Sequence, residues 1–209
     1  MTSFRFPSHL YPIVDTLGDP GRLHVEIAEA MFAAGIRFLQ LRIKDQPTRR
    51  FVDVARAVQA RAVAHGAALI INDRSDIARL VNAAGVHLGQ EDLPPADARR
   101  LLGPDSIIGF STHSVVQADA AAREGAADYL GFGPIYETMS KTNPDPVQGL
   151  DGLGSVRGSI PLPIVAIGGI TLETMPAVLA AGADAVAVIG DLVRASDVGA
   201  RVRQFLAVR

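Results

Sequence analysis

The chain has 209 residues, enough for one large domain or two small ones, and no linker of biased composition divides it. With 20 basic and 22 acidic residues its formal net charge is -2, and no dense run of lysine and arginine predicts a nucleic-acid surface. The lack of cysteine excludes disulfides and thiolate metal sites, and neither a signal peptide nor an apolar run of membrane-spanning length is apparent, so we expect a soluble cytoplasmic protein.

The chain repeats one pattern eight times: a short apolar run, a loop with polar residues, and a longer segment with helical spacing. The apolar runs predict strands at 10–15, 38–42, 68–72, 85–88, 107–111, 129–133, 163–167 and 185–189. The longer segments predict helices at 23–34, 48–65, 75–82, 94–102, from 114 onward, and at 151–157, 171–181 and 192–206. Ser114 and Gln117 form a capping box that predicts the start of the fifth helix.

Short, continuously apolar strands that alternate with amphipathic helices are typical of a parallel sheet covered by helices. Eight such units in about 200 residues indicate a (β/α)8 TIM barrel, an α/β fold at the small end of its size range. We expect a single domain over residues 1–209 with a short N-terminal extension at 1–9. A doubly wound open sheet is the alternative.

Polar residues and glycines follow most of the predicted strands. In a parallel barrel the residues after the strands share one mouth, so we expect these side chains to lie together. They are Gln40, Arg42 and Lys44, then Asn72 and Asp73, then Asp92, then Ser111 and His113, then Thr138, Ser140 and Lys141 in a long loop, and finally Gly168, Gly169 and Gly190.

The combination of cations, carboxylates and glycines at the mouth predicts a site for phosphates. Lys44, Lys141 and Arg42 can neutralise an anion, and Asp73 and Asp92 are hard oxygen ligands on neighbouring loops that suit Mg2+. Glycines that precede helices can offer backbone N–H groups to a phosphate. We therefore expect a monophosphate on one side of the mouth and a magnesium-bound polyphosphate on the other. The strand histidine His87 is more typical of a hydrogen-bonded core residue than of a catalyst.

Seven segments resemble, in order, the motifs of the thiamine phosphate synthase family. They are QLRIKD (40–45), INDRSDIA (71–78), GVHLGQEDL (85–93), IGFSTHS (108–114), ADYLGFGPIYETMSK (127–141), PIVAIGGIT (163–171) and GADAVAVI (182–189). The resemblance covers nearly the whole chain from Leu10. It implies a small TIM barrel that joins a pyrimidine diphosphate to a thiazole phosphate with Mg2+, releases pyrophosphate and forms thiamine phosphate, with a homodimer as a possible assembly.

The resemblance also implies roles for individual residues. The diphosphate and the pyrimidine side would be bound by Gln40, Arg42, Lys44 and Asn72, and the pyrimidine would also contact Ser111. Mg2+ would be held by Asp73 and Asp92, and the loop residues Thr138, Ser140 and Lys141 would close over the phosphates. The thiazole phosphate would be bound by backbone N–H groups of Gly168, Ile189 and Gly190. Lys44, Lys141 and Ser111 would act in catalysis, the two lysines as electrostatic partners of the departing pyrophosphate.

One departure from the family concerns the eighth strand. The family commonly has valine, serine and alanine where this chain has Ile189, Gly190 and Asp191, so that a carboxylate lies near the proposed phosphate. Two alternatives remain open at this point. A thiazole tautomerase of the same fold would use a histidine at the position of His113, and a non-catalytic barrel that binds phosphate ligands would bind without turnover.

Overall fold

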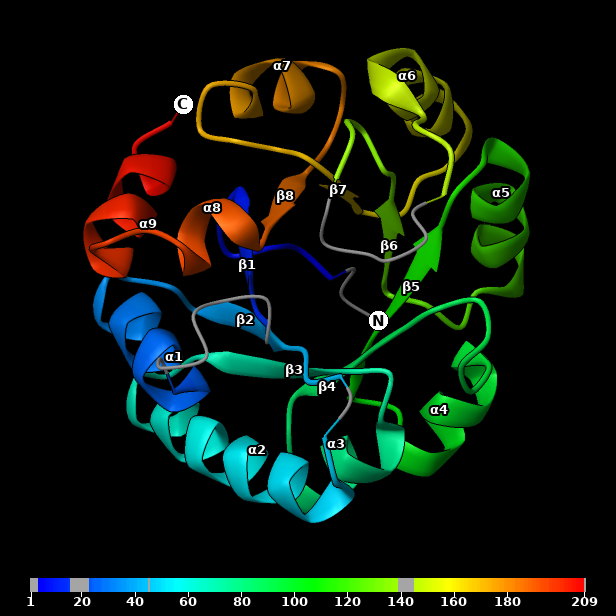
Figure 1. Ribbon diagram of the computed structural model, residues 1–209. Coiled ribbons are helices and arrows are strands. Elements are labelled where there is room, and N and C mark those ends of the chain that lie inside the picture. Colours follow the sequence, from blue (N-terminus) through cyan, green and yellow to red (C-terminus); the bar gives the residue numbers. More distant parts are fainter. Residues whose placement is uncertain (1–3, 16–22, 45, 139–144, 209) are drawn as a thin grey trace.

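The computed structural model describes residues 4–15, 23–44, 46–138 and 145–208. Eight parallel strands pair in sequence order and close into a barrel, because β1 (Leu10–Val14) also pairs with β8 (Ala185–Val188). Helices follow the strands and surround the barrel as an outer ring (Figure 1). The predicted (β/α)8 fold is therefore confirmed, and the open sheet is excluded.

The predicted strands are all present, and their ends differ from the prediction by one residue at most. The remaining strands are β2 (Phe38–Leu41), β3 (Ala68–Asn72), β4 (Gly85–Leu88), β5 (Ile107–Thr112), β6 (Tyr129–Phe132) and β7 (Ile164–Ile167). The helices are α1 (His24–Ala33), α2 (Thr48–Ala64), α3 (Ser75–Val81), α4 (Pro95–Leu102), α5 (Val115–Glu124), α6 (Gly149–Ser159), α7 (Met175–Ala180), α8 (Gly190–Val193) and α9 (Val198–Leu206).

The end of the chain corrects one predicted element. The helix expected over 192–206 is divided into α8 and α9, because Asp197 Oδ1 accepts the backbone N–H of Ala200 at 2.8 Å and begins a new helix. One of the two hydrogen bonds of the predicted capping box at α5 is present, since Ser114 Oγ accepts the N–H of Gln117 at 3.2 Å. Gln117 Oε1, however, accepts the N–H of His113, one residue before the position that a capping box predicts.

Two hydrophobic clusters build the molecule. The larger fills the layer between the strands and the helices, and the smaller lies inside the barrel and contains Tyr11, Ile13, Phe38, Ile70, Tyr129, Val165, Ala185 and Ala187. Phe4 lies with its ring centroid 5.4 Å from that of Phe38, and Phe6 lies 5.1 Å from Tyr129. Phe38 and Tyr129 begin their strands, so these four aromatic rings close the barrel at the amino-terminal ends of the strands.

No helix in the described part of the chain is both long enough and apolar enough to cross a membrane.

Candidate active site

A cavity of about 640 Å³ opens at the carboxyl-terminal ends of the strands. It is lined by eight of the residues that the sequence predicts for the site, namely Gln40, Arg42, Asn72, Ser111, Thr138, Gly168, Ile189 and Gly190. These residues come from the ends of six different strands or the loops that follow them. The barrel mouth therefore brings together most of the predicted site.

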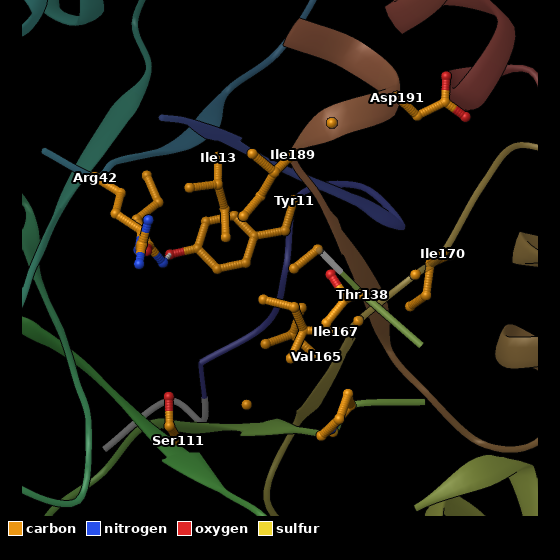
Figure 2. A pocket seen from close by; sticks show the side chains of 18 of the residues that line it. Tyr11, Ile13, Arg42, Ser111, Thr138, Val165, Ile167, Ile170, Ile189 and Asp191 are labelled. Carbon is orange, nitrogen blue, oxygen red and sulfur yellow. Dashed lines mark hydrogen bonds between the residues drawn. The ribbon is translucent and has the colours of Figure 1, made fainter. Parts of the chain in front are cut away.

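The centre of the cavity is apolar. Figure 2 shows Tyr11, Ile13, Val165, Ile167 and Ile189 gathered around it, with Arg42, Ser111 and Asp191 farther out. Tyr11, Ile13 and Val165 belong to the cluster inside the barrel and are almost fully buried. Walls of this kind accept flat apolar rings and exclude water from them.

A chain of hydrogen bonds runs beneath the cavity from Gln40 to Ser111. Gln40 Nε2 donates to the Tyr11 hydroxyl at 2.9 Å, and the hydroxyls of Tyr11 and Tyr129 lie 2.8 Å apart. The ring of His87 then bridges Tyr129 and Ser111, with Nδ1 3.0 Å from the Tyr129 hydroxyl and Nε2 2.9 Å from Ser111 Oγ. His87 is the hydrogen-bonded core histidine that the sequence predicts, and it also positions a predicted site residue.

Burial keeps the two tyrosines and the histidine of this hydrogen-bond network uncharged. Burial raises the pKa of Tyr11 and of Tyr129 far above the ordinary phenol value, so both hydroxyls keep their protons. It also lowers the pKa of His87 to about 4, although the carboxylate of Asp73 acts in the opposite direction. Gly109 leaves the space that two of these side chains need, because a Cβ there would lie 2.2 Å from Tyr129 Cζ and 2.4 Å from His87 Nδ1.

The depressed pKa of His87 predicts a loss of stability in acid. Unfolded His87 takes up a proton near pH 6.5, whereas the folded protein takes it up only near pH 4. The unfolded state therefore binds more protons between these values, and the free energy of unfolding should fall by roughly 3 kcal/mol as the pH drops through this window. Urea denaturation at pH 7 and pH 4.5 would measure the fall. His87→Gln should reduce it, and an unchanged pH dependence in this variant would contradict the assignment.

The second strand carries the cationic side of the mouth. Arg42 forms an ion pair with Asp15, whose side chain is fully buried at the end of β1. Lys44 Nζ pairs with Asp73 Oδ2, and Asp73 follows Asn72 directly at the end of β3. The lysine is the more exposed partner, at 45% against 18%. Both cations thus have fixed carboxylate partners at the edge of the cavity.

Asp73 and Asp92 are the predicted Mg2+ ligands, and the structure places them next to each other, with Lys44 paired to Asp73. Burial raises the pKa of Asp92, the N–H of Gly89 at 2.7 Å from its Oδ2 lowers it, and the neighbouring Asp73 raises it again. Two mutually repelling carboxylates suit Mg2+, which binds through one or two carboxylates and takes its other ligands from water or substrate phosphate. Within the described residues no group of three or more histidine or acidic side chains could hold a metal.

Three predicted residues near the metal site do not line the cavity itself. These are Lys44, Asp73 and Asp92. Ser140 and Lys141 lie outside the described residues, and their roles remain predictions.

The long loop after β6 is fastened to β7 and returns to its own start. Ile135 donates its N–H to Ile167 O at 2.8 Å, and Tyr136 donates to Gly168 O at 3.0 Å. At the other end Gln148 donates its N–H to Pro134 O at 2.8 Å. These bonds place Thr138 on the cavity wall (Figure 2).

Glycine is required at position 168. Its φ is +104°, which side chains rarely adopt, and a Cβ would lie 2.5 Å from Pro134 Cβ. Within the described part of the chain, the backbone N–H groups of Gly168 and Gly190 have no hydrogen-bond acceptor. Both glycines line the cavity, so these two N–H groups are free to bind a ligand.

The carboxylate of Asp191 is neutralised by Arg201 from α9. Arg201 Nε lies 2.6 Å from Asp191 Oδ1, and Nη2 lies 2.9 Å from Oδ2. The pair raises the pKa of Arg201 above its ordinary value. The negative charge that the sequence places near the proposed phosphate is therefore balanced within the protein.

Several cavity residues were not predicted as site residues from the sequence. Tyr11 lies on β1 and lines the cavity. Asp15 does not line the cavity but pairs with Arg42, and its signal in the sequence was a carboxylate directly after an apolar run. Arg194 and Arg201 lie beyond the eighth strand.

His113 lines the cavity but is held by the backbone. Its Nδ1 lies 2.7 Å from Gly133 O, which requires the proton on Nδ1, and its Nε2 lies 3.5 Å from Asp145 Oδ2. The ring therefore faces the cavity with a fixed orientation.

Comparisons with known proteins agree with this geometry. A family model described as thiamine monophosphate synthase matches residues 10–192. A thiamine-phosphate synthase of Moorella thermoacetica is 43% identical over 199 residues, which cover 95% of this chain and 94% of that protein. Another, of Methanospirillum hungatei, is 42% identical over 196 residues, covering 94% and 95%. Among solved structures, a thiamine phosphate pyrophosphorylase from Pyrococcus furiosus superposes with a TM-score of 0.83 and 35% identity, over 94% of this chain and 92% of its own.

Proposed function

Because the chain belongs to the thiamine monophosphate synthase family, we propose that the cavity at the barrel mouth is where it makes thiamine phosphate from a pyrimidine diphosphate and a thiazole phosphate. The protein thus acts in thiamine biosynthesis as a transferase. The observation that carries the assignment of the site is an apolar slot with separate anion-binding groups at its two ends. The identity to named synthases favours this reaction over a tautomerase and over a non-catalytic barrel.

We place the pyrimidine over the hydrogen-bonded chain. Ser111 and Gln40, at the two ends of that chain, would contact the polar edge of the ring. Arg42 and Asn72 lie at the same part of the wall and would bind the diphosphate together with Lys44. Thr138, Ser140 and Lys141 would close over the phosphates from the loop after β6. The rigid support beneath Ser111 and Gln40 is what gives the ring a defined orientation.

We place the phosphate of the thiazole at the opposite end, over the free N–H groups of Gly168 and Gly190 with Ile189 between the rings and the phosphate. Backbone N–H groups at this end of a TIM barrel are well suited to a phosphate.

Asp73 and Asp92 would hold Mg2+ together with the diphosphate. When bound, the ion stabilises the negative charge that develops on the leaving pyrophosphate. Lys44 and Lys141 would add two positive charges to the same anion.

The reaction then follows from charge and from the exclusion of water. The C–O bond to the diphosphate breaks and leaves a cation on the pyrimidine methylene, which the amino-substituted ring can delocalise. The thiazole nitrogen attacks this carbon and forms the new C–N bond. The apolar walls formed by Ile13, Val165 and Ile167 would keep water away from the cation, so that the thiazole captures it. The protein needs no covalent intermediate.

A direct assay tests this proposal. Purified protein with pyrimidine diphosphate, thiazole phosphate and Mg2+ should produce thiamine phosphate and pyrophosphate in equal amounts. EDTA should abolish the product, and added Mg2+ should restore it. Product formation that EDTA leaves unchanged would contradict the metal assignment, and the absence of product under all conditions would contradict the function.

A further inference from the structure

The eighth strand leads into a short turn whose last residue points back at the cavity. Arg194 ends α8, and its N–H bonds to Gly190 O at 3.1 Å. The guanidinium lies against Gly190, because a Cβ there would be 2.4 Å from Arg194 Nη2 and 2.8 Å from Cζ. Both residues line the cavity. A positive side chain thus occupies the space that the missing Gly190 side chain leaves.

The two arginines at this end of the cavity differ in what they already bind. Arg201 is occupied by Asp191 through two hydrogen bonds, by Gln204 Oε1 at 2.9 Å, and by the ring of Phe205 at 5.5 Å. Arg194 forms no ion pair or side-chain hydrogen bond with any residue that the structure describes. Its side chain is exposed at the cavity wall. Arg194 is thus the cation available to a ligand at this end.

A guanidinium in this position can recognise a phosphate directly. Its planar set of N–H donors matches two phosphate oxygens at once, which a backbone N–H group cannot do. Because Asp191 is already neutralised by Arg201, it does not cancel the charge of Arg194. A phosphate over Gly190 would therefore meet both the backbone N–H and the guanidinium.

We propose that Arg194 is a specificity-determining residue that selects a phosphorylated thiazole over the corresponding alcohol. The inference rests on the proposed placement of the thiazole phosphate and adds a side chain to it. Gly190 serves the same purpose, since any larger residue would displace the guanidinium.

The test compares Arg194→Gln with the wild type, using thiazole phosphate and the unphosphorylated thiazole alcohol as alternative second substrates. The variant should raise the KM for thiazole phosphate roughly tenfold or more, the effect of losing a charge-assisted hydrogen bond. The KM for the pyrimidine diphosphate should stay within about twofold of the wild type, and the preference for thiazole phosphate over the alcohol should fall by a similar factor to the rise in KM.

Two further variants keep the result interpretable. Arg203→Gln removes the same charge from an exposed position of α9 that does not line the cavity, and it should behave as the wild type. Gly190→Ala displaces the guanidinium without removing it and should raise the same KM by a smaller factor. An unchanged KM for thiazole phosphate in Arg194→Gln, with the wild type active, would overturn the inference alone. An inactive wild type would overturn the function.

Discussion

Replacing Asp92 by asparagine should lower kcat/KM by about 100-fold or more and should raise the Mg2+ concentration needed for half-maximal activity. Asparagine keeps an oxygen that can accept the N–H of Gly89, so the loop after β4 should keep its shape while the charge is lost. The variant should be at least as stable as the wild type, because burial and the nearby Asp73 both disfavour the charged carboxylate. Steady-state rates over a Mg2+ titration and thermal denaturation would measure the two effects.

Asp97→Asn provides the matched control for this variant. It removes a carboxylate from α4 that pairs with Arg100 on the protein surface, and it should change neither the rate nor the Mg2+ dependence. A variant of Asp92 that loses activity but keeps the wild-type Mg2+ dependence would show that this carboxylate acts in some way other than metal binding.

Replacing Lys44 by methionine should lower kcat by roughly 100- to 1,000-fold, the usual consequence of removing one charge partner of a developing anion. The side chain of methionine keeps most of the length of lysine, and the ion pair with Asp73 is partly exposed, so the change in stability should be small. Single-turnover measurements of pyrophosphate release would separate this loss in the chemical step from a loss in binding.

The charge and the shape of Lys44 can be tested separately. Lys44→Arg retains the charge and should recover part of the rate, whereas Arg100→Gln, at an exposed position of α4, should have no effect. A kcat for Lys44→Met close to that of the wild type, with only the KM for the diphosphate raised, would limit the lysine to substrate binding.

The order of strands and helices could be predicted because each strand is an uninterrupted apolar run. The same regularity predicted Ser111 for the site, and the structure places it on the cavity wall, because residues at the carboxyl-terminal ends of barrel strands surround the mouth. The division of the last helix was not predicted, because Asp197 is one polar residue among several and only the local geometry makes it a cap.

The contacts across the barrel could not be predicted from local spacing. Tyr11 and Tyr129 are 118 positions apart in the chain and share a hydrogen bond inside the barrel. Asp191 is a second example, because the sequence showed its negative charge but not that Arg201 would neutralise it. Local pattern determines which face a side chain points to, and long-range packing determines which partner it meets there.

The aromatic rings of Phe4, Phe6, Phe38 and Tyr129 close the barrel at the amino-terminal ends of its strands, so the cavity opens at the other end. In the proposed function, both substrates would enter and both products would leave through the mouth at the carboxyl-terminal ends of the strands. A compound bound at the floor, beside Ser111 and Gln40, is covered by whatever binds above it. The position of each ligand along the barrel axis would therefore also determine the order in which the ligands bind and are released.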